Sequence, residues 1–420
     1  MKALKLPAKA RELGAALRQR RSERKRLRGP ADLHYAIADS VSMLNADAWR
    51  ALTANAGIFM SIEYLAMLER VLPHTMSARY ALIHAEEDGQ LVPVAALYMQ
   101  LADVGLKQSR SGESDAAGWK KPLRKLEAAA TQRLLVCGNL LSYGQHGVAF
   151  AQDIDPALAW HGVAEVLYRV RQADRLRGKT HFVIVKDLHS HWIDQAKRLS
   201  TLSYRYVETE PNMVLQLDPA WRSYDDYLAS LASKYRSNAR NAILKPIDEG
   251  GCRIEAMTDL AAHEARVFEL YKSVQANAGL RPFELRPEYF AALQRMAGSR
   301  MRCSGLWRGD KLLGFLVSLA DGDTSIAYHI GFDREAAAEL PIYLRLLHAG
   351  IADAIALGCK RISYGRTALE PKASLGAQPE DFGVLVRHRQ PVLNKLLKHV
   401  LLGIEHADAP ERNPFKKTKE

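Results

Sequence analysis

The stretches SIEYLAMLERVL at residues 61–72 and RPEYFAALQRM at residues 286–296 can be laid over each other without a gap. Ile62–Leu65 then align with Pro287–Phe290, and Leu68 aligns with Leu293. Each stretch follows a strand-like segment and a first helix-like segment. These are LHYAIADSV (33–41) and NADAWRALTANA (45–56) in one place, and CRIEAM (252–257) and DLAAHEARVFELYKSV (259–274) in the other. The match predicts a duplicated unit.

Both copies continue in the same way after these helices. A β-rich pair of segments follows each, with Glu86–Gly89 as the turn in the first copy and Arg308–Asp310 in the second. Such Asp-Gly and Gly-Asp turns are typical of hairpins. A further strand, a long helix and a closing strand complete each copy. The second long helix has one apolar face, formed by Leu340, Leu344, Leu347, Ile351 and Ile355. The predicted order is strand, helix, helix, three strands, helix, strand, twice.

The rest of the chain divides around the two copies. We expect a basic tail at 1–30, an N-terminal domain at 31–220, a C-terminal domain at 221–400 and a C-terminal tail at 401–420. Residues 104–131 form a polar, basic insertion that contains Trp119. Residues 223–246 read as a helix that joins the domains and ends near Pro246.

The charge is concentrated at the N-terminus. Residues 1–28 carry eleven Lys or Arg against two Glu, or +9 of the chain's net +12, so the folded body is nearly neutral. This distribution argues against DNA binding. The tail either lies on an anionic membrane surface, binds RNA or another acidic partner, or is a solvated segment without a specific role. No stretch is apolar enough to span a membrane and no secretory signal is visible, so we expect a cytoplasmic protein, peripheral at the inner face of the cytoplasmic membrane if the tail binds lipid.

Three motifs in the second half resemble a known family. They are the basic helix start Ser233–Arg240, the helix opening Leu340–Leu344, and the stretch Tyr364–Lys372. Together with the repeat they resemble the GNAT superfamily, and within it the two-lobed FemAB-like N-acyltransferases. The resemblance covers residues 33–395. It implies an α/β fold of the α+β type with two tandem GNAT-like domains, each a mixed, mostly antiparallel sheet flanked by helices.

One segment departs from the family pattern. GNAT enzymes hold the coenzyme A pyrophosphate on a glycine-rich loop at a helix N-terminus. Here the equivalent segment, Gly331–Glu339, lacks those glycines and contains two Glu. We therefore expect no permanently bound cofactor, and a co-substrate, acyl-CoA or an acyl carrier protein, that is not held in the standard position.

Two histidines are candidates for the general base that amine acylation requires. His329 lies in a predicted strand beside Tyr328, and His146 lies at the equivalent point of the corresponding predicted strand in the first copy, Leu141–Gly147, which also carries a Tyr. A neutral imidazole suits this role near neutral pH, although either histidine could instead be structural. We expect one of the two, with His329 favoured, to be the base, and the other to orient the acceptor amine.

Further polar residues complete the predicted site. Tyr364 is a candidate proton donor and Glu370 an alternative base acting through water, while Arg366 and Lys372 are candidate substrate ligands. Three other residues are candidate substrate contacts: Asn139, Tyr143 and Tyr328. Glu370 and Lys372 could equally form a surface ion pair.

A cluster of cations opens the second copy. Lys234, Arg236 and Arg240 have helical spacing and no acidic residue four positions away. Like charges so placed repel one another unless an anion neutralises them. They are candidates to bind the phosphates of the donor, or they form a solvated basic face.

These observations favour direct acyl transfer from a thioester to an amine. No metal site and no nucleophile motif is visible in the sequence. The acceptor we expect is a cell-envelope or lipid precursor, for example a sphingoid base. Two alternatives stay open: an aminoacyl-tRNA-dependent transferase that acts on a peptidoglycan precursor or a protein, and a degenerate GNAT scaffold that binds a lipid or protein partner.

Overall fold

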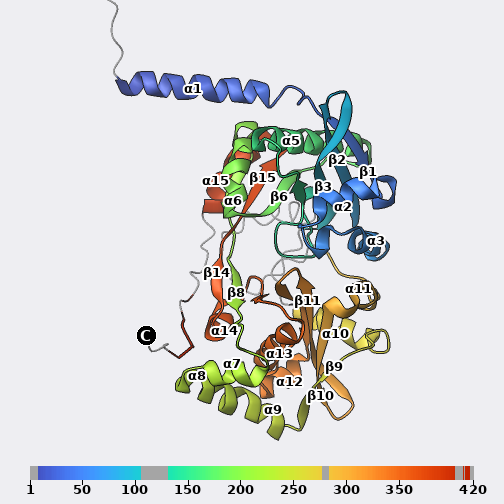
Figure 1. The fold of residues 1–420 in the computed structure, drawn as a ribbon, viewed down its shortest axis with the longest axis vertical. Helices are drawn as coiled ribbons and strands as arrows, with labels where there is room; N and C mark the ends of the chain where they lie inside the picture. Colours follow the sequence, from blue (N-terminus) through green and yellow to red (C-terminus); the bar gives the residue numbers. More distant parts are fainter. Residues whose placement is uncertain (1–7, 106–130, 277–282, 403–409, 411, 417–420) are drawn as a thin grey trace, which may run out of the picture.

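The protein has two lobes stacked along its longest axis, with a long helix standing away from the first lobe (Figure 1). The structure is a computed structural model and describes residues 8–105, 131–276, 283–402, 410 and 412–416. Nearly all of the predicted insertion at 104–131, including Trp119, lies outside the described residues.

The first lobe is built on a mixed sheet in the order β1-β2-β3-β4-β6-β15-β7, with β5 paired to β3. Only β4 and β6 run parallel; the other pairs are antiparallel. The strands are β1 (His34–Ala38), β2 (Met76–Glu87), β3 (Gln90–Gly105), β4 (Thr131–Cys137), β5 (Val148–Phe150), β6 (Phe182–His189), β7 (Arg205–Glu208) and β15 (Phe382–His388). The helices of this part include α2 (Ala46–Thr53), α3 (Ile62–Val71), α5 (Pro156–Ala173) and α6 (Ser190–Ala196), with short 3₁₀ turns at Val41–Met43, Ile58–Met60, Asp174–Arg177 and Lys197–Leu202.

The second lobe repeats this design in the order β14-β8-β13-β12-β11-β10-β9, with β12 and β13 as its parallel pair. Its strands are β8 (Asn212–Gln216), β9 (Cys252–Ala256), β10 (Met301–Arg308), β11 (Lys311–Asp321), β12 (Thr324–Phe332), β13 (Arg361–Ser363) and β14 (Gln378–Glu380). Its helices include α10 (Glu264–Gln275), α11 (Tyr289–Ala297), α12 (Arg334–Glu339), α13 (Ile342–Ala356) and α14 (Leu369–Ser374). The predicted duplication and the predicted mixed sheets flanked by helices are confirmed.

The two sheets exchange one strand each. β8 follows β7 of the first lobe in sequence but pairs with β13 and β14 of the second, whereas β15 follows β14 and pairs with β6 and β7 of the first. The predicted domain limits, 31–220 and 221–400, therefore do not separate the sheets. Sequence periodicity could not show this, because a strand looks the same whichever sheet it joins.

The lobes also share one hydrophobic core. A single cluster of buried side chains runs from α2 and α3 to α10, α11 and β12, and includes Tyr64, Phe59, Tyr289 and Tyr328. Apolar burial contributes about 25 cal/mol per Å², so a core continuous across both lobes resists their separation. The shared core therefore holds the facing surfaces of the two lobes in a fixed relative position.

The predicted joining helix at 223–246 is broken into pieces. α7 (Tyr224–Ser230) begins with a capping box of Ser223 and Asp226 and ends where Leu231 becomes extended and buried. α8 (Ser233–Asn238), a π-helical turn (Ala239–Leu244) and α9 (Lys245–Glu249) follow. Pro246 does not end the helix: the helical backbone continues from the π-helical turn through Pro246 to Glu249.

The break at Leu231 is stabilised by the end of the chain. Leu231 forms a β-bridge with Phe415, and the amide of Ala232 donates to the carbonyl of Pro414 at 2.8 Å. The described part of the predicted C-terminal tail therefore docks on the second lobe. α15 (Pro391–Leu402) precedes it and lies beside the first lobe (Figure 1).

The basic N-terminal segment forms α1 (Ala8–Arg26), which carries Arg24, Lys25 and Arg26 in its last turn. Leu27 behind it is buried in the first lobe, and the carbonyl of Gly29 contacts His161 Nε2 at 3.0 Å. Among the described residues no helix is both long and apolar enough to cross a bilayer.

Candidate active site

A cavity of about 1160 Å³ lies between the lobes. Its wall on the first lobe comes from α2, α3, the loop before β5 and the end of β6; its wall on the second comes mainly from the turn between β11 and β12. Polar and charged side chains line it from both lobes: Arg50, Asn55, Glu63, Gln145, His146, His189, Arg300, Asp321 and Asp323. This volume is large enough for a drug-sized molecule.

His146 is the candidate base that the fold brings to this cavity. Its Nδ1 lies 2.8 Å from Ser142 Oγ, its Nε2 lies 3.8 Å from Asp321 Oδ2, and its ring packs on Phe59 at 4.5 Å. Burial, reinforced by the charge of Lys186, lowers the pKa of His146 to about 3, so the imidazole is neutral at neutral pH. A carboxylate facing Nε2 favours a proton on that nitrogen, which leaves Nδ1 as the acceptor that faces Ser142.

Asp321 reaches this position from the second lobe. It ends β11, and its Oδ1 accepts the backbone N–H of Ile58 at 2.5 Å. Gly57 makes the approach possible: its φ is +81°, and a Cβ there would lie 2.6 Å from Asp321 Oδ2. Burial raises the pKa of Asp321, against the opposing Ile58 hydrogen bond. Sequence reasoning missed this residue because Asp321–Gly322 reads as an ordinary hairpin turn.

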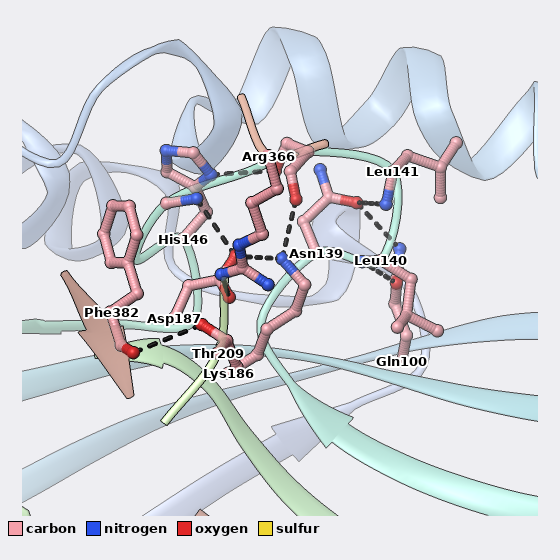
Figure 2. A network of polar contacts seen from close by, with 12 residues as sticks. Gln100, Asn139, Leu140, Leu141, His146, Lys186, Asp187, Thr209, Arg366 and Phe382 are labelled. Carbon is pink, nitrogen blue, oxygen red and sulfur yellow. Dashed lines mark hydrogen bonds and ion pairs between the residues drawn. The ribbon is translucent and has the colours of Figure 1, made fainter. Parts of the chain in front are cut away.

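The loop that carries His146 is fixed from below by a buried ion cluster (Figure 2). Asp187 is fully buried, pairs with Lys186 and with Arg366 of the second lobe, and accepts the Gly144 N–H at 3.1 Å. Lys186 Nζ also donates to the Ser142 carbonyl at 2.7 Å. Burial alone would raise the pKa of Asp187, but the two cations outweigh it and the pKa is lowered.

Arg366 is predicted from the sequence to be a substrate ligand. The carboxylate that it binds is that of Asp187, which also pairs with Lys186, so one carboxylate is shared by two cations within the protein. Neither Lys186 nor Asp187 was a sequence candidate, because a Lys-Asp pair at a strand end looks like a solvated surface pair.

Tyr143 and Lys372 lie next to Arg366. The Tyr143 ring covers Gly365 and lies 5.8 Å from the Arg366 guanidinium. Lys372 is buried and its Nζ donates to the carbonyls of Gly365 and Arg366 at 3.0 and 2.8 Å. Lys372 therefore holds the loop after β13 in shape, rather than facing the inter-lobe cavity.

His329 is placed differently from His146. It lies within β12, among the rings of Tyr271, Tyr289, Phe290 and Tyr328, and its Nε2 has no hydrogen-bond partner among the described residues. Burial lowers its pKa to about 3. It does not line the inter-lobe cavity. The two histidines are also not equivalent, since His146 follows β4 in a loop rather than lying in a strand.

Asn139 and Tyr328 belong to a buried hydrogen-bond chain that crosses the lobes. Asn139 Nδ2 donates to Tyr64 Oη at 2.9 Å, and Tyr328 Oη lies 3.1 Å from Tyr64 Oη and 2.7 Å from Tyr289 Oη. Asn139 Oδ1 accepts from Leu141 N–H. With these groups satisfied inside the protein, the chain aligns the lobes rather than contacting a ligand in the cavity.

Tyr364 and Glu370 are not brought to the cavity. Tyr364 is buried in the second lobe, its hydroxyl donates to the Leu347 carbonyl at 3.3 Å, and burial raises its pKa, which weakens it as an acid. Glu370 is exposed and pairs with Arg412.

The cations of the joining segment lie on the outer side of the second lobe (Figure 1). Arg236 donates to the carbonyls of Ala229 and Leu231 at 3.3 and 3.1 Å, and so caps the end of α7. Lys234 and Arg240 are exposed. None of the three lines the inter-lobe cavity.

The segment Gly331–Glu339, which departs from the family pattern, contains a carboxylate at the start of α12. Asp333 caps α12, accepts the Ala336 N–H at 3.2 Å and pairs with Arg266 and Lys311. Burial opposes these partners, yet they lower its pKa to about 2. A protein carboxylate thus occupies the helix terminus where a phosphate could otherwise bind.

This fold is that of two-lobed GNAT proteins. Residues 233–373 match the family model of the acetyltransferase (GNAT) domain. The chain is similar to the crystal structure of FemX, with 11% identity and a TM-score of 0.50 over 87% of this chain and 100% of that one. It is equally similar to a tandem GNAT protein from the clavulanic acid biosynthesis pathway, with 12% identity and a TM-score of 0.50 over 86% and 99% of the two chains. No curated protein matches the sequence significantly.

Proposed function

We propose that the chain is an N-acyltransferase whose reaction takes place in the inter-lobe cavity. The donor is an acyl thioester, acyl-CoA or an acyl carrier protein, and the acceptor is the amine of a cell-envelope or lipid precursor such as a sphingoid base. The observation that carries this proposal is the position of His146, a neutral imidazole on a cavity wall between Ser142 Oγ and the carboxylate of Asp321.

In this reaction the amine nitrogen attacks the thioester carbonyl carbon, the carbon–sulfur bond breaks, and a thiol leaves. The attacking nitrogen must lose a proton; His146 Nδ1 accepts it through the Ser142 hydroxyl and then returns it to the leaving thiolate, which departs as the thiol. A pKa lowered to about 3 makes His146 a weak base by itself, so its imidazolium depends on Asp321 for stabilisation, in the way a buried carboxylate supports a catalytic histidine. The fixed core between the lobes keeps these groups in place without a rearrangement.

The second part of the proposal concerns the donor. Because Asp333 already fills the terminus of α12, the donor phosphates bind elsewhere than at that terminus. The two reacting groups, the amine of the acceptor and the thioester of the donor, then approach His146 within the inter-lobe cavity.

The test is a thiol-release assay with purified protein, short- and long-chain acyl-CoA, and a sphingoid base or ethanolamine as acceptor. We expect His146→Ala to lower turnover by about 10² or more. His329→Ala is the matched control, since His329 is equally shifted in pKa but lies outside the cavity; it should retain turnover to within a few-fold. Loss of turnover in the His329 variant alone, with His146→Ala active, would contradict the assignment. Acyl transfer from aminoacyl-tRNA, and from no thioester, would show that the donor is an aminoacyl-tRNA and not a thioester.

A further inference from the structure

A second cavity lies at the opposite end of the first lobe from the inter-lobe cavity. It has a volume of about 260 Å³ and is lined by Arg171, Gln172, Arg175, Lys179, Thr180 and Arg389. Thr180 precedes β6 and Arg389 follows β15, whereas His189, at the far end of β6, lines the inter-lobe cavity. The length of β6 separates the two cavities by roughly 20 Å or more.

The lining of this cavity is strongly basic. Four of its six residues are cations, and among the described residues none of these four forms an ion pair with a carboxylate. Asp174, in the same turn, is buried and bound by Arg79 through two hydrogen bonds of 3.1 and 2.7 Å. The turn therefore offers no free counter-charge to the cavity.

The cations also crowd one another. Burial and the charges of Arg387 and Arg389 lower the pKa of Arg171. Thr180 contributes a buried hydroxyl with no hydrogen-bond partner in the described chain. Uncompensated like charges and an unpaired buried hydroxyl each cost free energy, and a phosphate would relieve both, since its oxygens accept from guanidinium, ammonium and hydroxyl groups.

An apolar space adjoins this basic cavity. A cavity of about 460 Å³ shares Arg171 and has apolar side chains of α5, β6 and the segment 202–204 on its wall: Ala164, Leu167, Val183, Leu202 and Tyr204. Tyr168, Arg387 and Glu165 also line it, and the Glu165 carboxylate is bound by the Ala31 N–H, the Tyr35 hydroxyl and Arg169. Leu27, Arg28, Gly29 and Pro30 close it on the side of α1. The basic cavity and the apolar cavity thus form one amphipathic site.

We propose that this amphipathic site binds an anionic phospholipid, with its phosphate at Arg171, Arg175, Lys179 and Arg389 and its apolar part in the adjoining cavity. The position of α1 supports a lipid over a soluble phosphate ester. The helix joins the body at the wall of this site, and its last turn carries Arg24, Lys25 and Arg26 (Figure 1). A membrane that supplies the lipid would meet both groups of cations at the same end of the molecule.

The test is calorimetric titration of the full-length protein with dihexanoyl-phosphatidylglycerol below its micelle concentration. We expect saturable binding that weakens with added salt. The double variant Arg175→Gln, Lys179→Gln, at two exposed positions, should bind about tenfold or more weakly. Arg177→Gln is the matched control: it removes a cation from the same turn, but Arg177 does not line the cavity, so affinity should be unchanged.

Two results would overturn the proposal. Equal affinity of the double variant and the wild type would show that the cavity is not the phosphate site. Equal affinity for glycerol 3-phosphate and the lipid would show that the apolar cavity is not used and that the ligand is a soluble phosphate. Thiol release with soluble substrates should be the same in the double variant as in the wild type. The experiment therefore tests the lipid site independently of the proposed acyltransferase activity.

Discussion

Asp321 Oδ2 of the second lobe lies 3.8 Å from His146 Nε2 of the first, so the candidate base and its carboxylate come from different copies of the duplicated unit. Both side chains are largely buried, with side-chain exposures of 8% for His146 and 15% for Asp321. The site is complete only when the lobes are joined. The shared core explains how such a pair keeps its geometry.

Replacing Asp321 by Asn should lower turnover by about tenfold or more, because the imidazolium loses its stabilising charge and Nε2 its preferred proton. The amide keeps the volume of the carboxylate. Asp323→Asn is the control, since Asp323 lines the same cavity but is exposed and pairs with Lys360 at 3.7 Å. Turnover and its pH profile, measured side by side, check this. Equal losses in the two variants would remove Asp321 from the mechanism.

Gly57→Ala should destabilise the protein more than its backbone conformation alone requires. Gly57 has φ +81°, and a Cβ there would overlap the Asp321 carboxylate. Gly89→Ala is the matched control, with φ +74° and nothing within 4 Å of the added Cβ. A positive φ alone costs about 1–2 kcal/mol for alanine, and Gly57, whose ψ is 176°, lies in a region open essentially to glycine, so its backbone and the overlap with Asp321 both add to the loss. Chemical denaturation should show a loss for Gly57→Ala that exceeds that of Gly89→Ala by about 1–3 kcal/mol. Identical losses would mean that neither the backbone conformation nor the approach of Asp321 requires glycine at position 57.

Arg366→Gln should destabilise the protein by about 2–3 kcal/mol, since it leaves Asp187 buried with Lys186 as its remaining cation. Arg361→Gln breaks a pair with Glu380 whose side chains are 30% and 32% exposed, and should cost no more than about 1 kcal/mol. Denaturant midpoints compare the two.

The pair of Arg366 and Asp187 should also make the stability of the protein depend on pH. The folded-state pKa of Asp187 is lowered, so its stabilising effect is present above the ordinary carboxylate pKa and is lost as the pH falls below it. The destabilisation caused by Arg366→Gln should therefore shrink in acid. A loss that is independent of pH would indicate that packing, and not charge, is what Arg366 provides.

Much of the fold follows from the sequence because each copy repeats its local signals. The overlay of Ile62–Leu65 on Pro287–Phe290 correctly pairs α3 with α11, and the hairpin turns fall where expected. The exchange of β8 and β15 could not be predicted, since partner choice depends on long-range pairing. The break at Leu231 was missed for a similar reason: it is stabilised by Phe415, far away in the sequence.

The site was predictable only in part. His146 was visible as a histidine between glycines, and it does line the inter-lobe cavity. Several other candidates, among them Tyr364, Lys372 and Arg366, are polar residues whose partners lie inside the protein. Sequence alone cannot tell a buried, satisfied polar group from one that faces a ligand, because the difference lies in burial and partners. Asp321 was missed since its role depends on contact with the other lobe.

Lys372 should give the stability of the protein an unusual pH dependence. Burial lowers its folded-state pKa to about 7, whereas an unfolded lysine titrates near pH ~10.4. Between these values the unfolded chain binds one more proton than the folded chain at this position, so the contribution of Lys372 to stability grows as the pH rises. Lys372→Met keeps the length of the side chain and removes the titration. Relative to wild type, it should be most favourable below pH ~7 and lose this advantage by up to about 1.4 kcal/mol per pH unit above it. Urea unfolding from pH 6.5 to 8.5 measures this difference, with Lys360→Met, at an exposed lysine, as the control that should show none. Parallel stability curves for wild type and Lys372→Met would show that the Lys372 ammonium stays protonated in the folded protein throughout this range.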